Sequence, residues 1–238
     1  MTDTATIQVL GAIAYGEWKA YEGAKATSTD MSLSDEERAA YKKIAAEELR
    51  HHKGFARRLE AMGADLERAM APYKGALDAF HSKDAHSKDA HSKDAHSKDA
   101  DRDPIAEAMG GYLGEGIADD LLEWLKTVVD DETREFVESV IADEEEHEAL
   151  ATAKLRALID AEPDGRARAG KAAREMIVHM LTSSGGGATQ PLRFAAFLRM
   201  GRPHDLVWRI VSGYARRMRA VGLNPFGLPA FSLANGSA

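Results

Sequence analysis

Apolar residues recur every three or four positions along most of this chain, which is the spacing of one face of an α-helix. The alternation of apolar and polar residues that is typical of a β-strand is almost absent. This periodicity predicts an all-α fold. The expected helices cover residues 6–27, 34–62, 66–80, 103–129, 131–158, 166–181, 192–200 and 205–221.

Two of these helices have clear start signals. Ser34 is followed three residues later by Glu37, which is the pattern of a capping box. Asp103 stands directly before Pro104, an N-cap residue followed by proline in the first turn. We therefore expect helices to begin at these two points.

Composition excludes several classes of protein. None of the 238 residues is cysteine, so disulfide scaffolds and thiolate metal sites are excluded. The first lysine is Lys19, and no uncharged apolar run approaches the roughly 18 residues that a membrane span needs. We expect no membrane partner and a cytoplasmic location.

Four of the expected helices carry a glutamate where the periodicity calls for an apolar residue. Two of these glutamates are followed three residues later by histidine, and residues three apart share one face of a helix. Each Glu-x-x-His pair can therefore point at the axis of a helical bundle. The residues concerned are Glu17, Glu48, His51, Glu115, Glu144 and His147.

The order of these residues is more specific than the motifs themselves. With 20 Glu and nine His, chance alone gives roughly 0.8 Glu-x-x-His matches in a chain of this length. However, each half of the chain pairs one glutamate with one Glu-x-x-His motif about 30 residues later. Glu, Glu-x-x-His, Glu, Glu-x-x-His is the ligand order of di-iron and di-manganese carboxylate bundles.

Charge supports a metal independently of this order. Four ionised carboxylates inside a bundle would each face a desolvation penalty of several kcal/mol and would repel one another. The apolar seams of helices 6–27, 34–62 and 131–158 contain no Lys or Arg, and Lys126 lies roughly 16 Å along its helix from Glu115. Two divalent ions would balance the four charges, and carboxylates with imidazole suit iron or manganese. The alternative is that a seam is misphased by one residue and its glutamate faces solvent.

Other acids near these motifs have plainer interpretations. Glu145, Glu146 and Glu148 are expected on a solvated helix face. Asp119 lies one turn beyond a predicted ligand; the alternatives are a spare ligand, a group that hydrogen-bonds to a ligand and, as the favoured interpretation, a helix-surface acid.

The chain divides by composition into three parts. Residues 1–165 would form the four-helix bundle, 166–223 a helical extension on the same domain, and 224–238 a tail. Residues 81–100 are four copies of His-Ser-Lys-Asp-Ala, which we expect to be an exposed, mobile insert because this period can bury nothing. Its four histidines could collect a divalent metal only weakly.

Charge is distributed unevenly between these parts. Residues 166–220 carry a net charge of +9 and residues 1–165 a net charge of −17. The basic segment can bind phosphate groups, or its arginines can lie on solvated faces of helices.

Five segments resemble one known group: the actinobacterial ferritin-like proteins described as similar to the tRNA isopentenyladenosine hydroxylase. The resemblance implies a ferritin-like four-helix bundle with additional C-terminal helices and a di-iron centre held by the six residues above. In the hydroxylase, this centre activates dioxygen to hydroxylate the prenyl side chain of a modified adenosine in tRNA. The segments are Ala14–Glu17, Ala45–His51, Met70–Leu77, Ile141–His147 and Arg216–Leu223.

The leading hypothesis is therefore an oxygen-activating di-iron oxidoreductase with two iron ions, or manganese in their place. Its partners would be dioxygen, an unidentified electron donor and tRNA bound through residues 166–220. A second hypothesis is a ferroxidase or iron-handling stress protein without an organic substrate. A third is a bundle whose metal is structural. The oligomeric state stays open, with a homodimer as one option.

Overall fold

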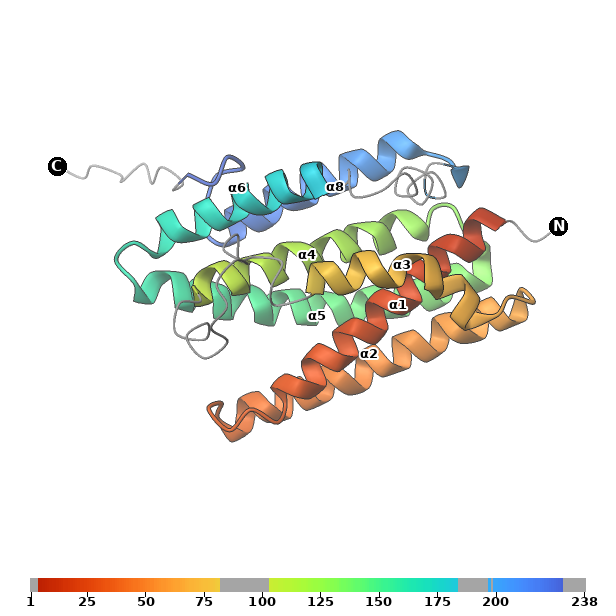
Figure 1. Cartoon of the computed structure of the whole chain (residues 1–238), viewed down its shortest axis with the longest axis horizontal. Coiled ribbons are helices and arrows are strands. Elements are labelled where there is room, and N and C mark those ends of the chain that lie inside the picture. The colour runs from red at the N-terminus through yellow and green to blue at the C-terminus, as the bar shows by residue number, and fades with distance from the viewer. Residues whose placement is uncertain (1–3, 82–102, 184–196, 198, 229–238) are drawn as a thin grey trace, which may run out of the picture. The chain divides into compact units, whose positions relative to one another are not determined.

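The structure is a computed structural model and describes residues 4–81, 103–183, 197 and 199–228. All elements longer than a turn in this part of the chain are α-helices, which confirms the predicted all-α fold. They are α1 (Thr4–Thr27), α2 (Asp35–Ala61), α3 (Leu66–His81), α4 (Pro104–Leu125), α5 (Asp131–Ala161), α6 (Gly165–Ser183) and α8 (Pro203–Ala220), as Figure 1 shows.

Both predicted helix starts are confirmed. Ser34 and Glu37 form the capping box at the start of α2, each side chain bonding to the other residue's backbone N–H. At the start of α4, Asp103 Oδ1 accepts hydrogen bonds from the backbone N–H groups of Ile105 and Ala106, at 2.9 and 3.3 Å. These contacts satisfy N–H groups that a helix leaves without an internal partner.

One helix ends earlier than predicted. The helix expected to continue to residue 129 ends at Leu125. The chain turns there because Trp124 O accepts hydrogen bonds from both the backbone N–H and the hydroxyl of Thr127, at 2.9 and 2.7 Å. Asp130 then caps α5 by accepting from Thr133 N at 2.8 Å.

The described helices divide into two compact units. The first consists of Met1–Ser92, Leu122–Glu144 and Gly187–His204, and the second of Lys93–Leu121, Glu145–Gly186 and Asp205–Ala238. Consequently, α4 and α5 each contribute residues to both units. The predicted boundary at residue 165 stays a prediction.

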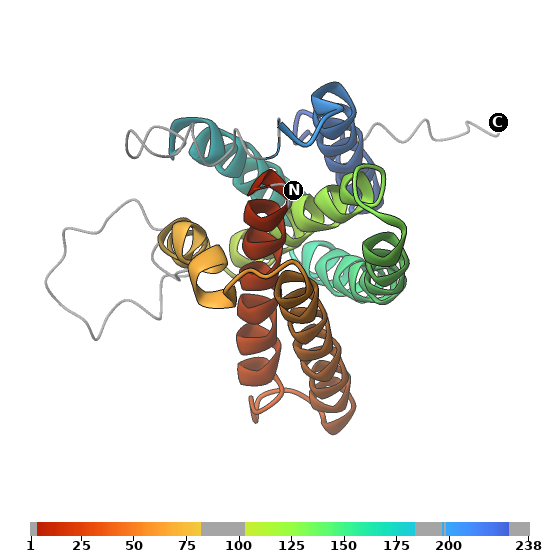
Figure 2. The same cartoon turned by 90° about the vertical axis from the view of Figure 1, so that its right-hand side faces the viewer.

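In the first unit, α1 and α2 form a helical hairpin, and α3 packs at an angle against α1 (Figure 2). α3 can approach α1 closely because Gly11 has no side chain: a Cβ there would overlap the carbonyl group of Ala69. Large apolar side chains fill the space between these helices and the parts of α4 and α5 that belong to this unit. They include Val9, Leu10, Phe55, Leu59, Met70, Trp124, Leu125, Val137 and Val140.

In the second unit, α6 and α8 contribute to the same apolar core as the remaining parts of α4 and α5. Arg168 on α6 binds both carboxylate oxygens of Asp103, at 2.6 and 3.0 Å, and so ties α6 to the start of α4. Gly170 on α6 lies directly against the backbone of Gly227, which follows α8. The core side chains include Ile105, Met109, Leu155, Ile159, Ala173, Leu206 and Met218.

Several sequence predictions fall outside the described residues. These are the repeat after His81, the helix expected over 192–200 except for single residues, and the tail after 228. Among the helices that are described, none has a stretch of sufficient length and apolar character to cross a bilayer.

Candidate metal centre

Three predicted ligands lie together on the α1–α2 hairpin. Glu17 occupies the buried side of α1, and Glu48 and His51 occupy one face of α2 because they are three residues apart. Their exposed fractions are only 7%, 5% and 1%. Buried carboxylates of this kind need a partner, since desolvation penalises their charge.

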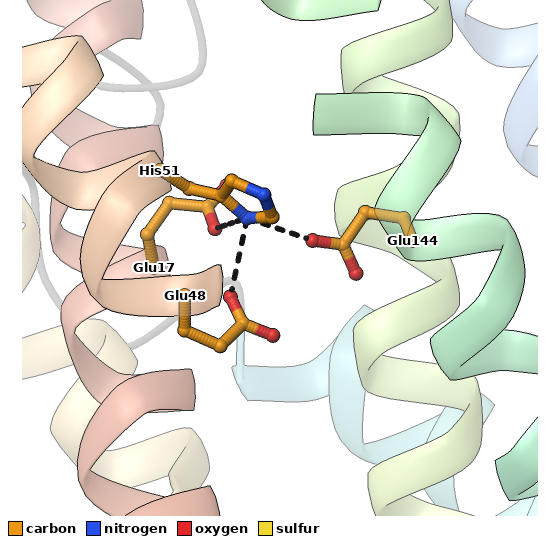
Figure 3. Close-up of side chains that lie close together, drawn as sticks. All are labelled: Glu17, Glu48, His51 and Glu144. Carbon is orange, nitrogen blue, oxygen red and sulfur yellow. Dashed lines mark ion pairs between the residues drawn. The ribbon is translucent and has the colours of Figure 1, made fainter. Parts of the chain in front are cut away.

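A fourth predicted ligand, Glu144, reaches the same point from α5 (Figure 3). The Nδ1 atom of His51 is the centre of the group. It lies 3.3 Å from Glu17 Oε2, 3.6 Å from Glu48 Oε2 and 3.2 Å from Glu144 Oε1. One polar atom from each of the four residues lies within 4.8 Å of the others.

The opposite side of the His51 ring is held by Asp143. Nε2 of His51 lies 2.8 Å from Asp143 Oδ2, and the same oxygen pairs with Arg50. Sequence analysis missed Asp143, although it directly precedes Glu144, because the pairing joins two helices and no spacing within one helix reveals it. A carboxylate on the far nitrogen fixes the orientation of an imidazole and makes it a better metal ligand.

Burial and mutual repulsion act on the charges of this cluster. Desolvation raises the pKa of Glu17 well above its ordinary value, and nearby Glu48 and Glu144 raise it further, although the hydrogen bond from His51 opposes both effects. For His51, burial alone would lower the pKa. Hydrogen bonds to Glu144, Glu17 and Glu48 outweigh burial and raise the pKa of His51 to about 12.

The donor set fits a metal ion. Two ligands on opposite sides of an ion, each ~2.1 Å from it, are ~4.2 Å apart, which is close to the spread of these four atoms. Three carboxylates carry three negative charges, of which one imidazolium can offset only one. Carboxylate oxygens with an imidazole nitrogen are the donors that iron and manganese accept, and Asp143 supplies the outer hydrogen bond that such a histidine needs.

Comparison with known families agrees with this geometry. The family model described as the ferritin-like domain of actinomycetes matches residues 2–190. The chain belongs to this family. A search of curated proteins found no match.

The other two predicted ligands of this ferritin-like chain belong to the second unit. Glu115 is exposed on α4, and His147 is half-buried on α5. Neither is in the four-residue cluster. Their role as ligands stays a prediction.

The buried side of α4 is broad and includes Ile105, Tyr112 and Leu122. Met109, Leu113 and Asp120 are buried, whereas Glu115 is exposed. On α8, the buried Arg217 binds Asp120 and lies so close to Gly116 that a Cβ there would overlap it.

Arg217 forms a second buried ionic cluster, which the sequence did not indicate. Its guanidinium donates to both Oδ atoms of Asp120, at 2.8 and 3.3 Å, to Asp119 Oδ2 at 3.4 Å and to Glu148 Oε2 at 3.2 Å. Arg216 also binds Glu148. The prediction of a solvated Glu148 is therefore wrong, and Asp119 is less exposed than a surface acid.

Arg217 is a buried cation that the apolar seams did not predict. No Lys or Arg interrupts the seams of the three helices considered above, but this cation comes from α8, far along the chain. Burial would lower the pKa of Arg217, yet the hydrogen bond to Asp120 and the surrounding carboxylates raise it. The guanidinium therefore stays charged and compensates the acids of its own cluster.

Proposed function

We propose that this ferritin-like chain is a di-iron protein that reacts with dioxygen. The observation that carries the proposal is the cluster of three carboxylates and the Nδ1 atom of His51 around one buried point. Family membership supports iron as the metal, with manganese as the alternative.

The residues of the cluster would have two roles, metal binding and orientation of the His51 ring. Glu17, Glu48 and Glu144 would hold the metal through their oxygens, and His51 through Nδ1. Asp143 would keep the proton on Nε2, so that Nδ1 presents its lone pair to the metal. Bound iron supplies the electrons and the open coordination positions that dioxygen needs.

Glu115 and His147 are the proposed remaining ligands. This proposal rests on the ligand order in the sequence, because the same order in carboxylate bundles binds two ions rather than one. The number of ions bound per chain therefore tests them directly.

The experiment is anaerobic loading with Fe(II), followed by iron analysis and admission of air. We expect two iron ions per chain in the wild type and a loss of iron in Glu48→Ala and Glu144→Ala. Glu145→Ala is the matched control, since it removes the same charge from an exposed neighbour of Glu144. Equal iron in all four proteins would overturn the proposal.

For the organic substrate, we propose tRNA, on the basis of the resemblance and of the basic segment 166–220. Several of its basic side chains pair with carboxylates of the chain, among them Arg166, Arg168, Lys171, Arg216 and Arg217. The phosphate contacts would come from the exposed ones, such as Arg166, Lys171 and Arg216, whose side chains are 54%, 71% and 56% exposed and whose surface ion pairs are weak.

Mass spectrometry of tRNA nucleosides from cells with and without the gene tests this substrate. A hydroxylated nucleoside that disappears with the gene supports it. Unchanged nucleosides, together with oxidation of Fe(II) in the absence of any organic substrate, would instead establish the second candidate, an iron-handling ferroxidase. The family's ferritin-like fold favours that candidate.

A further inference from the structure

The first unit contains three successive contacts between α2 and the start of α5. At one end, Arg58 donates to Thr133 Oγ1 at 3.1 Å and to Asp130 Oδ1 at 3.2 Å. At the other end, His51 meets Asp143 and Glu144. Residue numbers rise along α2 as they fall along α5, so the two helices are antiparallel.

Between these two contacts, the Phe136 ring packs directly against the backbone of Gly54. Gly54 is buried, and a Cβ built on it would overlap the Cζ and Cε2 atoms of Phe136. The Phe136 ring also packs edge-on against Phe55, with centroids 4.9 Å apart and an interplanar angle of 75°. Any side chain at residue 54 would therefore push the ring, or α5 itself, away from α2.

This contact lies close to the candidate metal centre. Gly54 follows His51 by three residues, which is about 4.5 Å along the helix. The separation of two packed helices depends on the side chains at their contact. Functional side chains must be held within about 0.5 Å of their working positions. A change in the α2–α5 separation at Gly54 would therefore also change the distance between His51 and Glu144.

We propose that Gly54 and Phe136 are positioning residues of the metal centre. The ring seated on the glycine sets the separation of α2 and α5, and with it the distance between His51 on one helix and Glu144 on the other. Phe136 offers no metal ligand and would act through the two helices. The proposal rests on the proposed function.

The test compares two glycine-to-alanine variants of the full chain by Co(II) titration and the visible absorption of bound Co(II). In Gly54→Ala the new Cβ overlaps Phe136, so we expect Co(II) affinity to fall ~10-fold or more and the absorption bands to shift. Gly16→Ala is the matched control: it is next to Glu17, yet its Cβ would meet nothing within 4 Å. We expect its affinity and spectrum to match the wild type.

A second substitution separates positioning from general damage. Adding Phe136→Leu to Gly54→Ala removes the overlapping ring atoms, so Co(II) affinity and spectrum should recover toward the wild type. Unfolding of the metal-free protein is measured in parallel. We expect Gly54→Ala to lose more free energy of Co(II) binding than free energy of unfolding. If Gly54→Ala does not fold, Phe136→Ala replaces it, since losing the ring should also weaken and shift Co(II) binding.

Three results would overturn the proposal. These are wild-type affinity and spectrum in Gly54→Ala, an equal loss in Gly16→Ala, and no recovery in the double variant. If the wild type itself binds no Co(II), the proposed function fails and the positioning role fails with it. Co(II) binding that is equal in every variant defeats only the positioning role.

Discussion

Two clusters of carboxylates in the described part of the chain are similar in burial and different in charge compensation. Around His51, the side chains of Glu17, Glu48 and Glu144 are 8%, 7% and 15% exposed. Around Arg217, those of Asp120, Glu148 and Asp119 are 8%, 17% and 18% exposed. The central group is 1% exposed in both.

The difference lies in the central group. A guanidinium is always charged and offers five donors, so the Arg217 cluster is complete without any ligand. An imidazole offers two nitrogen atoms, and one of those of His51 already faces Asp143. The comparison teaches that a buried acidic cluster indicates a metal only when the chain supplies no arginine of its own. The following predictions test this contrast.

The largest expected effect is that of Arg217→Met. This change removes the buried guanidinium that Asp119, Asp120 and Glu148 share, although Glu148 keeps Arg216; breaking a buried ion pair costs about 3–5 kcal/mol. Urea unfolding should show a loss of this size in the free energy of unfolding. Arg168→Met is the control: its pair with Asp103 is partly exposed, so solvent screens it and the loss should be much smaller. Equal losses in both variants would mean that burial does not increase the contribution of the Arg217 cluster to stability.

Removing one carboxylate from each cluster should have opposite consequences in metal-free protein. Asp120→Asn weakens a hydrogen bond to a charged group and should cost about 1.5–3 kcal/mol. Glu48→Gln removes one of three crowded charges and should leave stability unchanged or raise it. Chemical unfolding of both variants in the presence of a chelator measures this. A clear loss in Glu48→Gln would show that the cluster is balanced without metal.

The two clusters should also differ in their response to pH. In metal-free protein the pKa of His51 is raised to about 12, above its unfolded value of about 6.5. The stability it contributes is therefore fully present below pH ~6.5 and is lost as pH rises through its folded pKa. The raised pKa of Glu17 acts in the same direction.

Unfolding measured between pH 6 and 9 with a chelator should thus show stability falling by up to about 1.4 kcal/mol per pH unit for each proton involved. His51→Gln should flatten this slope, whereas Arg217 stays charged throughout the range and should not contribute to it. Metal affinity should instead rise with pH, because binding displaces a proton. A slope that persists in His51→Gln would assign the effect to another group.

The smallest expected effect concerns the second arginine of the Arg217 cluster. Arg216 also binds Glu148, but its side chain is 56% exposed. Exposed ion pairs contribute little, so Arg216→Gln should change stability by no more than about 0.5 kcal/mol in thermal unfolding. A loss comparable to that of Arg217→Met would show that the number of charges, rather than burial, determines the strength of this cluster.

Much of the helical layout could be predicted from the sequence, because it depends on local signals. Apolar periodicity, the capping box at Ser34 and the N-cap at Asp103 each act within a few residues. The place where a helix ends was less predictable, as the turn after Leu125 depends on how Thr127 bonds back to Trp124.

From the sequence, residues of the site could be grouped only where they share one face of a single helix. Glu48 and His51 share a face by spacing alone, and the structure brings Glu17 and Glu144 to them. The partners that join different helices could not be read from spacing. Asp143 meets His51 across 92 residues, and Arg217 meets Asp120 across 97.

The most direct test of the metal assignment is an anomalous difference map at the iron edge from crystals grown anaerobically with Fe(II). The account predicts a peak bounded by Glu17, Glu48, Glu144 and the Nδ1 atom of His51, with Asp143 still on Nε2. Iron found only elsewhere, for example on the histidines of residues 81–100, with His51 retaining its three carboxylate contacts, would contradict it.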